Sequence, residues 1–374
     1  MARPHPAASA PLPTGRVPAA PGYIRGMAPG LLFALTLAQA AGPCGACTPG
    51  ANAWLAQVEA APPPHPEPGY HFAADVAAEL APLVAERPGV IHPFELGRSG
   101  EDRPIVGFRM QDPGAPVVGR LLVFANIHAM EWVPTEVALA FAKEFVANPV
   151  PGVEVVLVPS LNVDGRAAVE RDLEAGRTKV YRRGNAAQVD LNRDFPVNRE
   201  SRAIWKVLIP GRYVVSPAPL SQPETRALDH LAAAEPFDAA VSLHAFGGFF
   251  YSPWAGRWER PRELRSFGRL GGVMQAAMAN HPYRPRQLSR WGFFFRGLGM
   301  EVDHLYATYG TLSFLIETTR SGIAGPADLS TPFRWYNPRD PAPHAREGVR
   351  YLRALAIEVA QGRAKRVSPP GAPT

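Results

Sequence analysis

The chain has 374 residues, of which 46% are hydrophobic, so it can bury a sizeable core and is not disordered as a whole. Its formal net charge is +6, and arginine supplies most of the positive charge. The sequence contains no long basic run and no basic stripe with interleaved aromatic residues, which argues against nucleic-acid binding.

Residues 1–41 are predicted to be a leader. Arg3, Arg16 and Arg25 precede the apolar run Leu31–Ala41, and the first acidic residue is Glu59. A basic stretch followed by a short apolar run and small residues is typical of a secretory signal peptide. The run is too short for a permanent membrane span. We therefore predict a secreted or periplasmic protein; a disordered Ala/Pro leader is the alternative interpretation.

A Pro-rich linker is predicted at residues 42–67, because it contains most of the stretch APPPHPEPGY. Cys44 and Cys47, the only cysteines, lie inside it and form either a local disulfide or two unpaired thiols. A folded domain is then expected at residues 68–365, followed by a tail at 366–374.

Helices and strands alternate along this domain. Helices are predicted at His71–Glu86, Pro134–Ala147, Gln222–Ala234, Arg262–Asn280 and His344–Gly362. Strands are predicted at Gly97–Met110 with a polar turn inside, at Leu121–Ala125, before Asn162, up to His244, and at Gly310–Thr319. Because most of these strands are continuous apolar runs, they predict a single α/β domain. Its mostly parallel mixed sheet should carry helices on both faces.

Functional groups of such sheets gather where strands end. His128 and Glu131 follow one predicted strand, His244 ends another, and Glu317 stands alone in the apolar stretch FLIETT. Singly, His128 and Glu131 could be ordinary polar residues at a strand-to-helix turn. His244 could be a hydrogen-bonded core residue, and Glu317 could pair with an arginine. Together, two imidazoles and a carboxylate make the His₂Glu set of catalytic zinc, which leaves one position for water. A further carboxylate can accept a proton from that water.

Several motifs resemble, in the same order, those of the zinc metallocarboxypeptidase family typified by pancreatic carboxypeptidases A and B. They are GRSGEDRPI, NIHAMEW, PSLNVDG, VYRRGN, VDLNRDFP, QPETRAL, VSLHAF and TLSFLIETT. The resemblance covers about residues 71–361 and implies that residues 68–365 are a catalytic domain. It implies one Zn²⁺ per chain, held by His128, Glu131 and His244, with Glu317 as the general base.

The resemblance also implies how a substrate is bound. Arg182 would polarise the scissile carbonyl and stabilise the oxyanion. Asn192 and Arg193 would bind a terminal carboxylate. Phe295 stands where many members have a tyrosine on a mobile loop. Val302 occupies the specificity position, which suggests an apolar pocket.

The predicted function is an exported zinc metallocarboxypeptidase that acts as a monomer and removes the C-terminal residue of peptides or proteins. Met130 replaces an arginine that often precedes the zinc glutamate, and Phe295 replaces the loop tyrosine. These two departures leave open a cell-wall hydrolase that acts on peptidoglycan stem peptides. An inactive peptide-binding relative is a further alternative. We expect no nucleic-acid partner and no permanent membrane span.

Overall fold

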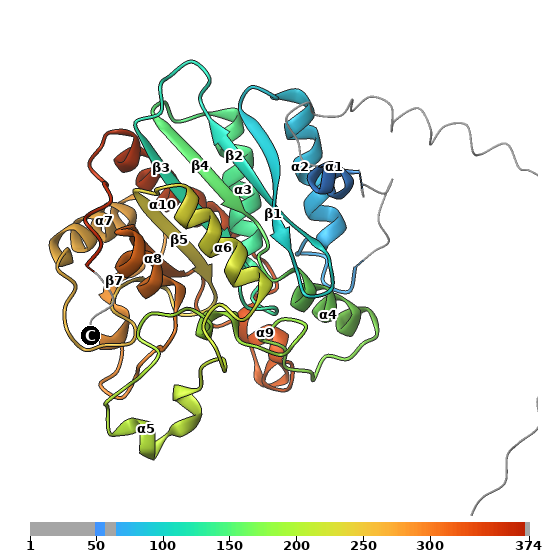
Figure 1. Ribbon diagram of the computed structural model, residues 1–374. Coiled ribbons are helices and arrows are strands. Elements are labelled where there is room, and N and C mark those ends of the chain that lie inside the picture. Colours follow the sequence, from blue (N-terminus) through green and yellow to red (C-terminus); the bar gives the residue numbers. More distant parts are fainter. Residues whose placement is uncertain (1–48, 57–64, 371–374) are drawn as a thin grey trace, which may run out of the picture. The chain divides into compact units, whose positions relative to one another are not determined.

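The computed structural model describes residues 49–56 and 65–370, and a mixed eight-stranded sheet lies at their centre (Figure 1). The strand order is β1-β2-β4-β3-β5-β8-β6-β7. The strands are β1 (Ile91–Arg98), β2 (Pro104–Gln111), β3 (Gly119–Ala125), β4 (Val153–Val158), β5 (Ala239–His244), β6 (Phe249–Ser252), β7 (Arg284–Gln287) and β8 (Leu312–Glu317). The pairs β3–β4, β3–β5, β5–β8 and β6–β7 are parallel, and the pairs β1–β2, β2–β4 and β6–β8 are antiparallel.

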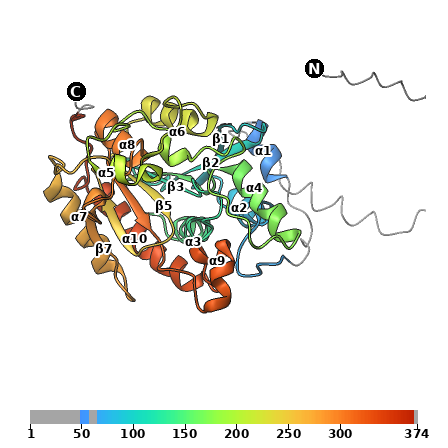
Figure 2. The ribbon, with the colours of Figure 1, turned by 90° about the horizontal axis from the view of Figure 1, so that it is seen from below.

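Helices cover both faces of the sheet, as predicted. The α-helices of the described residues are α1 (Pro49–Leu55), α2 (Ala73–Glu86), α3 (Val133–Ala147), α4 (Val163–Glu174), α5 (Trp205–Leu208), α6 (Pro223–Ala234), α7 (Leu264–Ala277), α8 (Glu301–Tyr309), α9 (Pro332–Tyr336) and α10 (Ala342–Ala360). Figure 2 shows α6 and α8 on one side of the sheet and α3 and α10 on the other. None of the helices in the described ranges is long and apolar enough to cross a membrane.

The central strands are buried on both faces, which explains their unbroken apolar sequence. In β3, Leu121 and Val123 join the core beneath α3 and α10, whereas Leu122 and Phe124 join the core on the opposite face. Successive side chains of a strand point to opposite faces, so a strand covered on both sides must be apolar throughout. Polar side chains that carry chemistry are therefore confined to the strand ends.

Two predicted segments differ from the structure. Residues 97–110 are not one strand, because β1 and β2 form an antiparallel hairpin closed where the Ser99 N–H donates to the Arg103 carbonyl at 2.9 Å. Residues 49–55, assigned to the linker, form α1, and Trp54 packs edge-on against Phe108 with ring centroids 5.9 Å apart. The predicted leader, both cysteines and residues 57–64 lie outside the described residues.

Candidate active site

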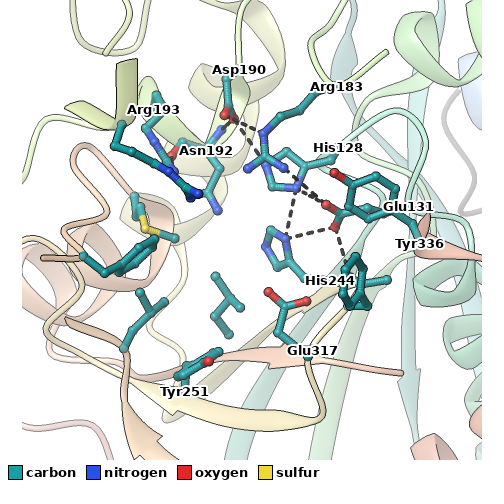
Figure 3. Close-up of a pocket in the computed structure, with 18 of the residues that line it drawn as sticks. His128, Glu131, Arg183, Asp190, Asn192, Arg193, His244, Tyr251, Glu317 and Tyr336 are labelled. Carbon is teal, nitrogen blue, oxygen red and sulfur yellow. Dashed lines mark hydrogen bonds and ion pairs between the residues drawn. The ribbon is translucent and has the colours of Figure 1, made fainter. Parts of the chain in front are cut away.

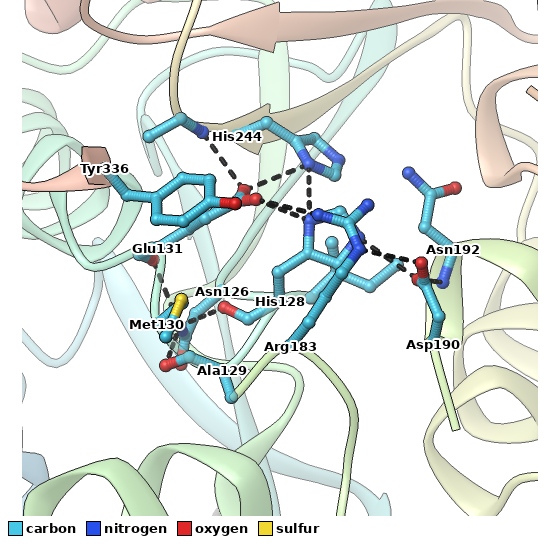
Figure 4. A network of polar contacts seen from close by, with 12 residues as sticks. Asn126, His128, Ala129, Met130, Glu131, Arg183, Asp190, Asn192, His244 and Tyr336 are labelled. Atoms are coloured by element: carbon cyan, nitrogen blue, oxygen red, sulfur yellow. Dashed lines mark hydrogen bonds and ion pairs between the residues drawn. The ribbon is translucent and has the colours of Figure 1, made fainter. Parts of the chain in front are cut away.

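The turn after β3 carries His128 and Glu131, and a left-handed asparagine shapes it. Asn126 has φ of 56°, a conformation that asparagine adopts more readily than most residues. Its Nδ2 donates to the carbonyl oxygens of His128 at 2.9 Å and Glu131 at 3.1 Å (Figure 4). The buried asparagine thereby holds the turn closed with both side chains directed to one point.

Two further buried asparagines support the same turn. Nδ2 of Asn337 donates to the Met130 carbonyl at 2.6 Å, and Nδ2 of Asn162 donates to the Ile127 carbonyl at 3.2 Å. Asn162 is the asparagine of the NVDG motif and also caps α4. These contacts tie the turn to α4 and to the residue after α9, so its geometry is set from three directions.

His244, at the end of β5, completes a compact cluster with His128 and Glu131 (Figures 3 and 4). Nδ1 of His128 lies 2.8 Å from Oε1 of Glu131, and Nδ1 of His244 lies 3.2 Å from Oε2 of Glu131. The two Nδ1 atoms are 3.1 Å apart. Two imidazole nitrogens and a carboxylate that converge in this way match the protein ligands of catalytic zinc. The donor set therefore fits the metal that the sequence predicts.

The charges in this cluster depend on one another. Burial by itself would raise the pKa of Glu131, but His128 and His244 hold that pKa below its ordinary value. Burial by itself would lower the pKa of His244, but hydrogen bonds to Glu131 and Glu301 raise it to about 10. Glu131 is thus ionised at neutral pH, as a metal ligand must be.

Asp190 connects His128 to Arg183. Its Oδ1 lies 3.2 Å from Nε2 of His128, and its Oδ2 accepts a hydrogen bond from Nε of Arg183 at 2.8 Å. Burial opposes ionisation of Asp190, but Arg183 and His128 lower its pKa well below the ordinary value. A carboxylate on the outer nitrogen of a histidine ligand fixes the ring and directs the other nitrogen to the metal.

Glu317, the last residue of β8, lies beside His244 because these two residues are register partners in the parallel pair β5–β8 (Figure 3). Its Oε2 is buried and has no hydrogen-bond partner among the described residues. Burial raises the pKa of Glu317 to about 8, and the charge of Glu131 adds to the effect. A carboxyl group with such a pKa beside a metal site is suited to exchanging protons.

The cluster opens into a cavity of about 1000 Å³, and one wall of this cavity is polar. Asn192 and Arg193 lie on this wall, where Nη1 of Arg193 donates to the Asn192 carbonyl at 2.6 Å. Within the described ranges, no carboxylate forms an ion pair with Arg193. Burial lowers the pKa of Arg193; the charge of Asp190 opposes this shift, and nearby Arg183 adds to it. An anion bound here would relieve this unfavourable environment.

A second part of the cavity wall is apolar. Tyr251, Leu288, Met300 and Leu315 line it, and Phe295 lies on the cavity as well. Val302, predicted to be the specificity residue, is not a lining residue. It is 1% exposed and packs in the same hydrophobic cluster as these wall residues, behind the surface of the cavity. Met300, at the N-terminus of α8, reaches the cavity in its place.

Arg182, predicted to polarise the scissile carbonyl, lies away from the cavity. The Arg182 side chain forms an ion pair with Asp172 of α4 and does not line the cavity. Arg183 lines it, and its Nη1 lies 3.4 Å from Oε1 of Glu131. The two neighbouring side chains thus point to different sides of the chain, and Arg183 is the one that faces the candidate metal ligands. Asp190, Glu301 and Tyr251 also lie at the histidines or the cavity, and the sequence pattern gave none of them a role.

An α/β domain with two histidines and one glutamate at its strand ends defines a class of zinc-dependent hydrolases. A protein-family model described as zinc carboxypeptidase matches residues 76–329, which is more than half of the sequence. The chain therefore belongs to the zinc carboxypeptidase family.

Curated relatives agree with this membership. Carboxypeptidase A2 of Mus musculus is 26% identical over 272 residues, which cover 68% of this chain and 64% of the relative. Carboxypeptidase D of Homo sapiens is 30% identical over 187 residues, which cover 46% of this chain and 12% of the relative. The matches thus span less than two thirds of the length of these relatives.

Solved structures share the fold. Thrombin activatable fibrinolysis inhibitor superposes with a TM-score of 0.64 at 17% identity, over 78% of this chain and 75% of that chain. Carboxypeptidase A of Helicoverpa armigera gives a TM-score of 0.60 at 18% identity, over 79% of this chain and 73% of that chain. The predicted α/β carboxypeptidase-like fold is confirmed.

Proposed function

We propose that this protein is an exported zinc metallocarboxypeptidase that removes the C-terminal residue of peptides or proteins. One cavity combines the cluster of His128, Glu131 and His244 with Glu317 and an arginine that has no ion-pair partner in the described part of the chain. This combination is the observation that carries the proposal. Export is inferred from residues 1–41 alone, which lie outside the described residues.

A zinc ion bound by His128, Glu131 and His244 would polarise the scissile carbonyl and lower the pKa of the attacking water. The carboxylate of Glu317 accepts a proton from this water as the oxygen bonds to the carbonyl carbon. It then passes the proton to the amine nitrogen as the C–N bond breaks. Its place beside His244 keeps this proton relay next to the reacting carbonyl.

Arg183 stabilises the negative charge that develops on the carbonyl oxygen. Its guanidinium group faces the cluster beside Glu131, and Asp190 holds it there at 2.8 Å. A fixed cation needs no reorganisation when the oxyanion forms, so it favours the transition state over the ground state. Arg182 takes no part, because it is bound to Asp172.

Asn192 and Arg193 bind the free carboxylate at the substrate's C-terminus. The planar guanidinium group can grip both carboxylate oxygens, and the anion provides the partner that Arg193 lacks in the described part of the protein. The apolar wall of Tyr251, Leu288 and Leu315 then receives the side chain of the terminal residue. Phe295 contributes an apolar surface at the cavity but no hydrogen bond.

A matched peptide pair with a free or amidated C-terminus tests this proposal. Amidation removes the charge opposite Arg193, so kcat/KM should fall about 10- to 100-fold. Arg193→Ala should lower kcat/KM by a similar factor for the free peptide and much less for the amide. Equal cleavage of both peptides by the wild-type enzyme would contradict a carboxypeptidase. A peptidoglycan stem peptide belongs in the same panel, and exclusive cleavage of it would favour a cell-wall hydrolase.

A further inference from the structure

Glu301 is a buried carboxylate that the proposed mechanism does not use. It is the first residue of α8 and is 0% exposed. Its Oε1 lies 3.1 Å from Nε2 of His244, and its Oε2 is buried without a hydrogen-bond partner in the described ranges. Burying a carboxylate is costly unless a cation or a hydrogen-bond donor faces it. The imidazole of His244 is that partner.

The contact decides which nitrogen of His244 carries a proton. Nε2 also faces the hydroxyl of Ser242, at 2.9 Å. A hydroxyl can donate or accept, so Ser242 alone would permit either tautomer. A carboxylate oxygen of Glu301 that accepts a hydrogen bond from Nε2 across this 3.1 Å contact selects the tautomer with the proton on Nε2. Nδ1 then directs its lone pair at the cluster formed with His128 and Glu131.

The backbone of Glu301 touches the other half of the site. Its N–H donates to Oδ1 of Asn192 at 3.4 Å. This contact uses the amide oxygen of Asn192 and leaves its NH₂ group for an anion in the cavity. The side chain of Glu301 thus contacts the candidate metal ligand His244, and its backbone contacts Asn192 on the carboxylate-binding wall. A substitution of the side chain therefore changes the first contact and keeps the second.

We propose that Glu301 is a positioning residue that fixes the tautomer and orientation of His244 and thereby sets the affinity of the site for zinc. This inference rests on the proposed zinc site. Asp190 has the equivalent place on His128, 3.2 Å from its Nε2. Each histidine ligand therefore has its own carboxylate on the outer nitrogen, which is the arrangement that orients ligands and raises their basicity.

The test compares the zinc affinity of metal-free wild type and Glu301→Gln by competition with a chromophoric chelator. Glutamine keeps the size of the side chain, but its NH₂ group can donate to Nε2 and favour the wrong tautomer. We expect zinc to bind about 10- to 100-fold more weakly, with an altered absorption spectrum of the Co²⁺ form. Equal zinc affinity in the two proteins would overturn the inference.

Two control variants separate this effect from a loss of stability. Asp303→Asn alters a second buried carboxylate of α8, which accepts from the N–H groups of Ala255 at 2.7 Å and Gly256 at 2.9 Å. It should melt at a lower temperature and keep its zinc affinity. Ser242→Ala should also keep its zinc affinity. A loss in Ser242→Ala or in Asp303→Asn as large as in Glu301→Gln would overturn the inference.

If Glu301→Gln does not fold, a second variant, Glu301→Asp, tests the inference. Glu301→Asp keeps the charge but shortens the reach to Nε2, so it should bind zinc more weakly than wild type. Where Glu301→Gln also folds, the zinc affinity of Glu301→Asp should lie between those of the other two proteins. Unchanged affinity would contradict the inference. A wild-type protein that binds no zinc would overturn the proposed function and this inference together. Tight binding by wild type and variants alike would overturn this inference alone.

Discussion

Arg182 and Arg183 are neighbours in the chain, but their guanidinium groups bind carboxylates in different parts of the fold. Arg182 pairs with Asp172 of α4, outside the cavity, whereas Arg183 donates to Asp190 at 2.8 Å and lines the cavity. The motif thus contains two arginines, one beside the candidate metal ligands and one away from them. This pair provides a matched comparison for the role of the cation.

Arg183→Gln should lower kcat/KM by about 10²- to 10³-fold, because it removes a fixed donor to the developing oxyanion. Arg182→Gln should change kcat/KM little and should lower the free energy of unfolding instead, since Asp172 loses one of its partners. Steady-state kinetics with one peptide and urea unfolding of both variants provide the measurements. A larger kinetic loss in Arg182→Gln would restore the assignment made from the sequence.

Zinc should be present at about one ion per chain, because the described residues hold one cluster of the His₂Glu type. Removing it with a chelator should abolish turnover and lower the melting temperature, since a ligand that binds only the folded state stabilises that state. His128→Ala, Glu131→Ala and His244→Ala should each lose the metal, as measured by elemental analysis. Full zinc occupancy in His244→Ala would show that another residue supplies the third ligand.

Glu317→Gln should separate metal binding from proton transfer. Glutamine has nearly the same shape but cannot accept the proton of water, so turnover should fall by about 10²-fold or more. The zinc content should stay the same because Glu317 is not among the three clustered ligands. Near-normal turnover in a zinc-loaded variant would assign the proton to a different acceptor.

The structure also predicts a pH-dependent contribution to stability outside the site. Nδ1 of His71 lies 2.6 Å from Oε2 of Glu136, and this hydrogen bond raises the pKa of His71 above its ordinary value. The folded state therefore favours the charged imidazole. This contribution is fully present below the unfolded pKa of about 6.5 and is lost as the pH rises through the folded pKa.

His71→Gln should therefore lower the free energy of unfolding by about 1 kcal/mol at a pH of about 6 and by less at a pH of about 9. The His71 side chain is 32% exposed, so solvent reduces the effect below that of a fully buried pair. Urea unfolding of wild type and variant at both pH values measures the difference. A difference that grows with rising pH would contradict the sign of the effect.

The convergence of the three candidate metal ligands with Glu317 could be predicted, because the order of the strands brings residues that are distant in the sequence close together. β3, β5 and β8 are adjacent and parallel, so the residues that follow or end them meet at one edge of the sheet. His128, His244 and Glu317 occupy these ends, and their polarity stands out against apolar strands. The sequence pattern therefore marks them as candidates, and the order of the strands explains why they converge.

Whether the other site residues face the cavity depends on the direction in which their side chains point, and the sequence pattern does not give this direction. Arg182 and Arg183 are the same residue type in an irregular segment, and only the fold shows which of them faces the cluster. Val302 is the second residue of α8 and turns away from the cavity, whereas Met300 just before the helix turns toward it. Glu301 meets His244 only because α8 packs against β5 and β8.

The wall that includes Met300 and Leu315 leads to a prediction about substrate choice. An unpaired charge placed against apolar side chains loses hydration, whereas a leucine or phenylalanine side chain gains about 25 cal/mol for each Å² of apolar surface buried. Peptides that end in leucine or phenylalanine should therefore be cleaved about 100-fold faster, in kcat/KM, than peptides that end in lysine or glutamate. A panel of peptides that differ only in the last residue measures this ratio.

Met300→Asp and Val302→Ala together show which residue sets the preference. Met300 is the N-cap of α8, a position that aspartate favours, so this substitution introduces a negative charge into the wall without opposing the helix. It should improve cleavage of peptides ending in lysine relative to those ending in leucine by about 10-fold, the effect of one charged pair. Val302→Ala opens a space in the core behind the wall, so it should lower stability and leave the preference unchanged. A change of preference in Val302→Ala alone would return the specificity role to Val302, because the wall would then transmit that residue's size to the substrate.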